Sequence, residues 1–72
     1  MENEIAQFDV YVYDENETVH DYIGNDLDAA INSFEQLKSN NINKTIDKEV
    51  TIVLYDNYNE KIIMDYNTLL DA

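Results

Sequence analysis

The chain has 72 residues, contains no Cys, and carries 16 acidic side chains against four lysines, for a formal net charge of −12 at pH 7. This length allows one domain, over residues 1–72, and the lack of Cys excludes disulfides and cysteine-based zinc sites. No apolar run approaches the roughly 18 residues that a membrane-spanning helix needs, and the charge disfavours direct binding to nucleic acid or anionic lipid. The first residues are acidic, unlike the basic start of a signal peptide, so we expect a soluble, cytoplasmic protein.

The acidic residues are concentrated in the N-terminal half of the chain. The first 37 residues hold ten carboxylates and no lysine, whereas Lys38, Lys44, Lys48 and Lys61 share the second half with the other six acids. A small domain must hold these like charges close together, and their mutual repulsion destabilises it. We therefore expect this costly negative surface to have a function, and the function that fits it best is binding to a positively charged partner.

A β-hairpin is predicted near the N-terminus. Residues 8–13 alternate between apolar and polar side chains with a period of two, which indicates a strand. The polar run 14–17 predicts a turn, and residues 18–23 predict the second strand. Asp21 breaks the inward pattern of that strand, so we expect a bulge or a frayed end there. Val19 and Ile23 should then face inward. The outward side chains of the two strands would be Asp9, Tyr11, Tyr13, His20 and Tyr22.

One amphipathic helix follows. Asn25 is the expected N-cap, with Asp26 and Asp28 in the first turn, where the helix dipole favours anions. Asn40 and Asn41 can adopt the left-handed conformation that ends a helix. The apolar positions fall on one helical stripe: Leu27, Ala30, Ile31, Phe34 and Leu37.

A second hairpin completes the chain. Residues 49–55 and 61–66 predict two strands on either side of a polar turn, with Ile62 and Met64 facing inward. The third strand should direct Val50, Ile52 and Leu54 to one face. Residues 42–48 are expected to form a loop, and Leu69 and Leu70 a short tail turn. The order ββαββ predicts an α+β fold, with the helix packed on one face of a four-stranded antiparallel sheet.

The side chains needed for catalysis are scarce. The chain contains one His, His20, and two serines, Ser33 and Ser39. The predicted elements do not bring a nucleophile and a base together, so we expect no enzymatic activity. Residues 14–18 begin like a calcium-binding loop, but Val19 and Asn25 occupy the positions that require Gly and Glu. We therefore expect no metal and no cofactor.

The candidate partner-binding residues are acids and tyrosines of the lysine-free half. Twelve net charges would match roughly 20 Å of duplex DNA, close to the expected length of a small domain. Tyrosines contribute large contact areas at interfaces. The competing interpretation is a solvated face that keeps the protein soluble, with tyrosines acting as ordinary strand formers. The candidates are Asp9, Tyr11, Tyr13, Asp14, Glu15, Glu17, Asp21, Tyr22, Asp26, Asp28 and Glu35.

The chain resembles small acidic proteins with which phages disarm host enzymes. The segment Phe-Asp-Val-Tyr-Val-Tyr-Asp-Glu-Asn-Glu at 8–17, followed by a strand and an acidic helix, is similar in order to two groups. These are the DNA-mimicking anti-CRISPR proteins and the phage inhibitors of uracil-DNA glycosylase. The resemblance rests on pattern, size and charge.

The resemblance implies a phage-encoded, non-enzymatic inhibitor that mimics DNA and blocks the nucleic-acid-binding groove of a host defence nuclease in the bacterial cytoplasm. An RNA-guided nuclease is the first expected target, because its channels are strongly positive. Two alternatives stay open: an inhibitor of uracil-DNA glycosylase, and a structural or adaptor protein that pairs through a sheet edge or a tyrosine face. The expected partner is a basic nucleic-acid-binding protein, and the chain itself a monomer or weak homodimer.

Overall fold

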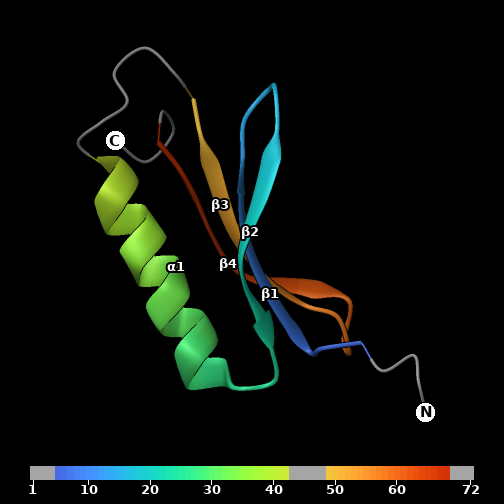
Figure 1. Cartoon of the computed structure of the whole chain (residues 1–72). Coiled ribbons are helices and arrows are strands. Elements are labelled where there is room, and N and C mark those ends of the chain that lie inside the picture. Colours follow the sequence, from blue (N-terminus) through green and yellow to red (C-terminus); the bar gives the residue numbers. More distant parts are fainter. Residues whose placement is uncertain (1–4, 43–48, 69–72) are drawn as a thin grey trace.

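The computed structural model describes residues 5–42 and 49–68. Its elements are β1 (Phe8–Tyr13), β2 (Thr18–Gly24), α1 (Leu27–Ile42), β3 (Thr51–Asp56) and β4 (Lys61–Asn67). The four strands form one antiparallel sheet in the order β2-β1-β3-β4, and α1 packs on one of its faces (Figure 1). The α+β class and the ββαββ order predicted from the sequence are confirmed.

The core lies between α1 and the helix-facing side of the sheet. Val10, Ile52 and Leu54 are completely buried, as the alternation in β1 and β3 predicts. Burying a side chain of this size contributes about 1.5–3 kcal/mol. The predicted helical stripe also packs inward, except that Leu27 at its start is 42% exposed. The buried cluster consists of Phe8, Val10, Ala30, Phe34, Ile52, Leu54 and Tyr66.

The start of α1 is capped by Asp26 and not, as predicted, by Asn25. Oδ1 of Asp26 accepts hydrogen bonds from the backbone N–H groups of Asp28 (3.0 Å) and Ala29 (3.3 Å). The first N–H groups of a helix lack intrahelical partners, so this carboxylate satisfies them and also interacts favourably with the helix dipole. Oδ1 of Asn25 instead accepts the N–H of Gln7 (2.7 Å) and ties the start of β1 to the β2–α1 connection.

Two boundaries differ from the prediction. α1 continues to Ile42, past the predicted end at Asn40 and Asn41. β3 begins at Thr51 instead of residue 49. Two predictions fall on residues outside the described ranges. They are the loop, of which residues 43–48 with Lys44 and Lys48 are not described, and the tail turn at Leu69 and Leu70.

β2 contains the expected irregularity. Tyr11 pairs with His20 and Val10 pairs with Tyr22, which leaves Asp21 as an extra residue in β2. A regular register would place Asp21 opposite Val10, whose side chain is completely buried. Burying an unpaired carboxylate costs on the order of several kcal/mol, so the bulge keeps the charge out of the core.

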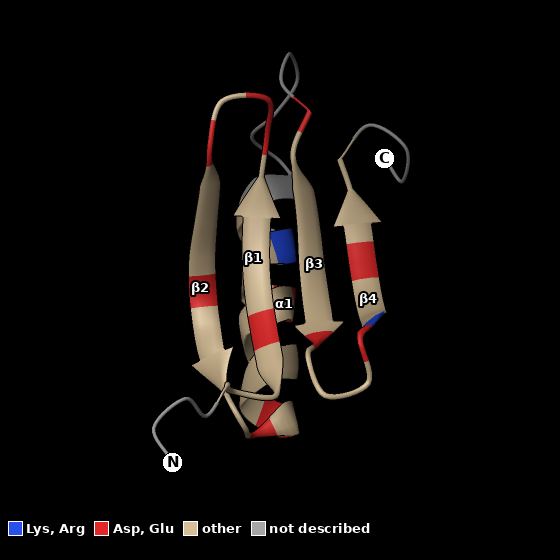
Figure 2. Ribbon diagram, turned by 90° about the vertical axis from the view of Figure 1, so that its right-hand side faces the viewer, with Lys and Arg blue, Asp and Glu red and all other residues tan. Residues whose placement is uncertain are grey.

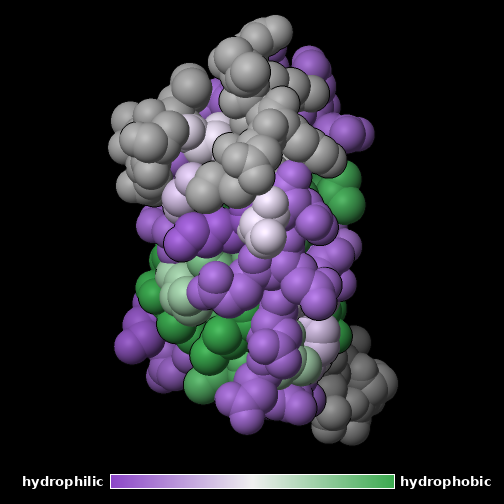
Figure 3. All heavy atoms as spheres, turned by 90° about the vertical axis from the view of Figure 1, so that its left-hand side faces the viewer, coloured by the Kyte–Doolittle hydropathy of each residue, from purple (hydrophilic) through white to green (hydrophobic). Residues whose placement is uncertain are grey.

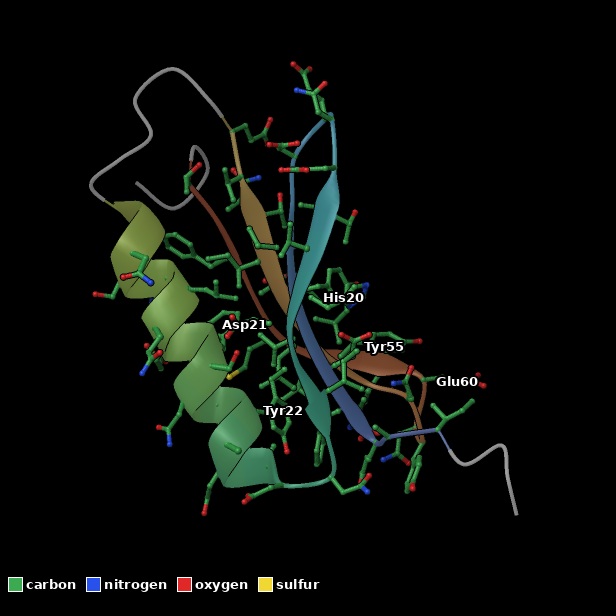
Figure 4. All side chains as sticks on the ribbon, viewed as in Figure 1. His20, Asp21, Tyr22, Tyr55 and Glu60 are labelled. Carbon is green, nitrogen blue, oxygen red and sulfur yellow. The ribbon has the colours of Figure 1, made fainter. Side chains whose placement is uncertain are left out.

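The bulge exchanges the faces predicted for the end of β2. Tyr22, predicted to face outward, packs against the buried cluster on the helix side, whereas Ile23, predicted to face inward, is 60% exposed. Figure 4 shows Tyr22 on the side of α1 and His20 on the opposite side. The Tyr22 hydroxyl accepts the N–H of Asp26 (3.1 Å). A Cβ at Gly24 would lie 2.4 Å from the Tyr22 hydroxyl oxygen, so glycine leaves room for this ring.

A second bulge has the same effect in β4. Met64 pairs with Leu54 and Ile62 pairs with Tyr55, which leaves Ile63 as the extra residue. Met64 packs against the core as predicted. Ile62, predicted to face inward, shares the opposite face with Tyr55 and is 53% exposed.

Candidate partner-binding surface

The charge asymmetry of the sequence becomes an asymmetry of the surface. Because the sheet order is β2-β1-β3-β4, the N-terminal hairpin forms one half of the sheet and the C-terminal hairpin the other. Both lysines of the described residues lie toward β4. Lys61 is the first residue of β4, and the Lys38 ammonium lies 5.0 Å from the centroid of the Tyr66 ring in that strand. Figure 2, which views the sheet from the side opposite α1, shows acidic residues in the β1–β2 turn, in β1 and β2 and at the start of α1, and also at the end of β3 and in β4, so the second half of the sheet differs mainly in holding the lysines.

The β1–β2 turn presents two glutamates on a rigid support. Oδ1 of Asp14 accepts the backbone N–H groups of Asn16 (2.7 Å) and Glu17 (3.0 Å), and the Asp14 N–H donates to the Glu17 carbonyl (3.0 Å). Asp14 therefore has a structural role in the turn. Glu15 and Glu17 are exposed, so their carboxylates are available to a partner.

Two further predicted acids follow β2 toward the helix. The Asp21 carboxylate at the bulge accepts a hydrogen bond from the Ser33 hydroxyl of α1. Asp26 is exposed but serves as the cap of α1. These carboxylates accompany an edge strand of seven residues, which is about 23 Å long. We call this series the acidic margin: Asp14, Glu15, Glu17, Asp21 and Asp26.

Asp28 and Glu35 do not belong to the acidic margin. Ser33 contacts Asp21 on the β2 side of α1, whereas Lys38 lies over Tyr66 on the β4 side. With 3.6 residues per turn, Glu35 points away from Ser33 and shares the Lys38 flank, and Asp28, seven residues earlier, lies on the same flank. The structure therefore separates two acids that the sequence grouped with the others.

The sheet side opposite α1 forms a second candidate surface. The cross-strand register places Ile23, Asp9, Tyr55 and Ile62 in one row across the sheet. The next row contains His20, Tyr11, Val53 and Asp65, and the third contains Tyr13 between Thr18 and Thr51. We call this surface the tyrosine face, defined by Asp9, Tyr11, Tyr13, His20, Ile23, Tyr55, Ile62 and Asp65; Val53 lies on the same side of the sheet but is buried.

Tyr11 is at the centre of the tyrosine face. Its ring centroid lies 6.1 Å from that of Tyr13 and 5.6 Å from the imidazole of His20. Nδ1 of His20 lies 2.8 Å from Oδ1 of Asp9. Partial burial, followed by the nearby Asp9, Tyr13 and Tyr55, raises the pKa of the Tyr11 hydroxyl. Tyr11 is therefore uncharged at neutral pH and presents an aromatic ring with a hydroxyl that can donate a hydrogen bond.

The predicted set is thus divided among several locations. Asp9, Tyr11 and Tyr13 share the tyrosine face as predicted, while Tyr22 is withdrawn into the helix–sheet contact. The sequence missed Ile23 and Ile62 as surface residues, because each lies just beyond or before a bulge. The only signal was the break in alternation at Asp21.

Both edges of the sheet are irregular. β2 carries the bulge at Asp21, and β4 carries the bulge at Ile63. Bulges and charged side chains on edge strands hinder the addition of a further strand. Neither edge therefore offers a regular template for the strand pairing considered for an adaptor protein.

The helix side differs in character from the tyrosine face. Figure 3 shows a mainly hydrophilic surface there, with hydrophobic areas toward the end of the molecule where α1 begins.

Within 5–42 and 49–68, no helix has the length and apolar character to cross a membrane. Those ranges also contain no group of three His, Cys, Asp or Glu side chains that could hold a metal ion.

Comparison with protein-family models, with curated proteins and with solved structures gives no match to this chain. A proposal for its function therefore depends on the geometry of the acidic margin and the tyrosine face.

Proposed function

We propose that this chain is a non-enzymatic acidic inhibitor, which occupies a basic nucleic-acid-binding groove of a host defence protein, in first place an RNA-guided nuclease. The observation that supports it most is the separation of charge across the sheet. The acidic margin follows β2, while both described lysines lie toward β4. A partner lined with Lys and Arg would be attracted to one side of the molecule and would bind it in a preferred orientation.

The charge density favours mimicry of a single strand. Over 44 Å, the longest dimension of the molecule, duplex DNA carries roughly 26 charges and one strand carries roughly 13. The net charge of −12 is close to the single-strand figure. The roughly 20 Å of duplex DNA that would carry the same charge is about half of the longest dimension of the molecule. The groove proposed is one that follows a single strand, such as the path of the displaced strand in an RNA-guided nuclease.

Inhibition of this kind requires no chemistry on the partner. The exposed carboxylates of Glu15 and Glu17 would contact Arg and Lys side chains that normally bind phosphates. Long-range attraction accelerates association at low ionic strength, and added salt screens it. Nucleic acid and inhibitor would then compete for the same groove.

The experiment is a charge reversal with a matched control. The double variant Glu15→Lys, Glu17→Lys changes exposed residues of the acidic margin and leaves Asp14 to hold the turn. The control, Glu35→Lys, Glu60→Lys, makes the same change outside the margin, and each variant has a net charge of −8 after adding two units per substitution to −12. Retention of nucleic-acid enzymes from a bacterial lysate, at low and moderate salt, is measured by mass spectrometry.

We expect the wild type and the control to retain one basic enzyme that the margin variant loses. A nuclease assay and a uracil-DNA glycosylase assay with the retained protein then distinguish the two targets, since the same surface would serve for either. Equal retention by all three proteins would contradict the proposal. Equal loss in both variants would contradict the role of the acidic margin and leave only non-specific attraction.

A further inference from the structure

The tyrosine face combines aromatic, aliphatic and acidic side chains in a way that indicates the chemistry of its ligand. Ile23 and Ile62 are 60% and 53% exposed at the two ends of one row. Asp9 and Tyr55 lie between them as cross-strand neighbours. The face thus has exposed aliphatic side chains at its two ends, with an aromatic ring and a carboxylate between them.

A purely apolar ligand does not fit this face. Asp9 lies within the row of apolar and aromatic side chains, and Asp65 is the neighbour of Val53 in the next row. A ligand without cations would remove both carboxylates from water and supply no donor to either, which is costly even though Nδ1 of His20 already lies 2.8 Å from Oδ1 of Asp9. The ligand must therefore bring positive charge to the middle of the face.

Arginine satisfies the face better than lysine. Tyr11 and Tyr55 are both neighbours of Asp9 on this face: Tyr11 lies two residues along β1, and Tyr55 is the cross-strand partner on β3. A guanidinium is planar, stacks on aromatic rings and donates two parallel hydrogen bonds to a carboxylate, whereas an ammonium is a compact, strongly hydrated charge. We propose that the tyrosine face binds an arginine-bearing segment of the partner, with a guanidinium stacked on Tyr11 or Tyr55 and paired with Asp9.

The inference rests on the proposed function for one point only, that the partner is a basic protein. A second copy of the chain fits the face poorly, because each copy carries a net charge of −12 and contains no Arg. The tyrosine face is also too small to form a standard interface by itself. Three strand spacings by six residues cover roughly 300 Å², against roughly 800 Å² on each side of a standard interface. The partner must therefore contact the acidic margin as well.

Hexa-arginine and hexa-lysine peptides test the inference without a known partner. The two probes have equal charge, so they separate recognition of the guanidinium from simple attraction to the acidic margin. Binding to the isotope-labelled chain is followed by chemical-shift changes of backbone amides and tyrosine rings. We expect hexa-arginine to bind about fivefold more tightly than hexa-lysine. Its largest shifts should occur at Tyr11 and Tyr55.

Three variants locate the selectivity. Tyr11→Leu, Tyr55→Leu removes both rings and should abolish the preference for arginine, whereas Tyr11→Phe, Tyr55→Phe keeps the rings and should retain it. Tyr58→Leu removes a tyrosine that is 62% exposed in the β3–β4 turn, outside the residues that define the face, and should leave the preference unchanged. Thermal unfolding checks that each variant is folded. Asp9→Asn, which keeps the side-chain shape and removes the charge, should weaken the preference for arginine and tests the pairing with the carboxylate if the leucine variant fails to fold.

Equal affinity for the two peptides, binding of neither, or selectivity that survives loss of both rings would overturn the inference. These outcomes differ from failure of the proposed function. If Glu15→Lys, Glu17→Lys still abolishes capture of the basic enzyme, the inhibitor proposal stands while the arginine site falls. If the chain prefers arginine but captures no nucleic-acid enzyme, the arginine site stands and the inhibitor proposal falls.

Discussion

The two hairpin turns use the same local device in different surroundings. In the β1–β2 turn, Oδ1 of Asp14 accepts the N–H groups two and three residues later, at 2.7 and 3.0 Å. In the β3–β4 turn, Oδ1 of Asp56 accepts the N–H groups of Tyr58 and Asn59, at 2.9 and 3.1 Å. Each Asp directly follows a Tyr: Asp14 comes just after β1, and Asp56 is the last residue of β3.

The second turn is held by additional contacts. Nδ2 of Asn59 donates to Oδ2 of Asp56 (2.7 Å), and Nε2 of Gln7 donates to Oδ1 (3.4 Å). The hydrogen bond from the Asn59 side chain, with those from the backbone and from Gln7, lowers the pKa of Asp56 below its ordinary value of 3.8 and outweighs its burial. The same residue type therefore has an additional role in the second turn, because Asp56 is buried and also holds Asn59 and Gln7, whereas residues 15–17 of the first turn are exposed.

Removing the two aspartates should separate local from tertiary stabilisation. We expect Asp14→Ala to lower the free energy of unfolding by about 1 kcal/mol, the net value of hydrogen bonds in an exposed turn. Asp56→Ala should lower it more, because it also leaves the Asn59 and Gln7 side chains without their acceptor. Urea denaturation of both variants gives the comparison. A larger loss at Asp14 would mean that the additional contacts of Asp56 contribute nothing.

The lowered pKa of Asp56 predicts a pH-dependent part of stability. A carboxyl group whose pKa is lower in the folded state stabilises that state above its unfolded pKa and loses the effect on protonation. The advantage of the wild type over Asp56→Asn should therefore be constant from about pH 7 to 5 and shrink below about pH 4. Melting temperatures measured across that range give the difference, in which the effects of the other acids cancel. An advantage that is constant down to about pH 2 contradicts the lowered pKa.

The smallest expected effect on stability comes from backbone strain in the β3–β4 turn. Glu60 in the β3–β4 turn has a φ of 54°, in the left-handed region that disfavours most side chains by about 1–2 kcal/mol. Glu60→Gly should stabilise the protein by roughly 0.5 kcal/mol, since the greater freedom of Gly in the unfolded chain offsets part of the relief. Glu60→Gln, which removes the charge and keeps the strain, is the control. If Gln stabilises as much as Gly, repulsion and not backbone strain is the cause.

Much of the fold follows from local patterns in the sequence. The stripe containing Phe34 predicts the buried side of α1, and the alternation of Val10 in β1 and of Ile52 and Leu54 in β3 predicts the core face of the sheet. These predictions succeed because the burial of many apolar side chains contributes more to the free energy of folding than any single polar contact. The strand order could not be predicted, since the pairing of β1 with β3 is a contact between distant segments.

The candidate surface was less predictable than the core. The excess of acid in the N-terminal half was visible, but not that Asp14 holds a turn, that Asp26 caps a helix, or that Asp28 lies on the other flank. The orientation of Tyr22 depends on the bulge and on the Asp26 N–H that its hydroxyl accepts. One extra residue reverses the face of every side chain after it, and the competition between burying Asp21 and interrupting the ladder is decided by tertiary packing.

The bulge in β2 also affects how this protein can evolve. Asp21 has no partner across the ladder, so deletion of this residue would leave each pair between β1 and β2 as it is. A lineage could therefore lose one carboxylate of the acidic margin by a single codon deletion while the residues facing the core stay in place. Such a step would alter the surface charge and shorten the chain at once. Insertions and deletions at this position are thus a route for adaptation that substitutions elsewhere in the strand do not offer.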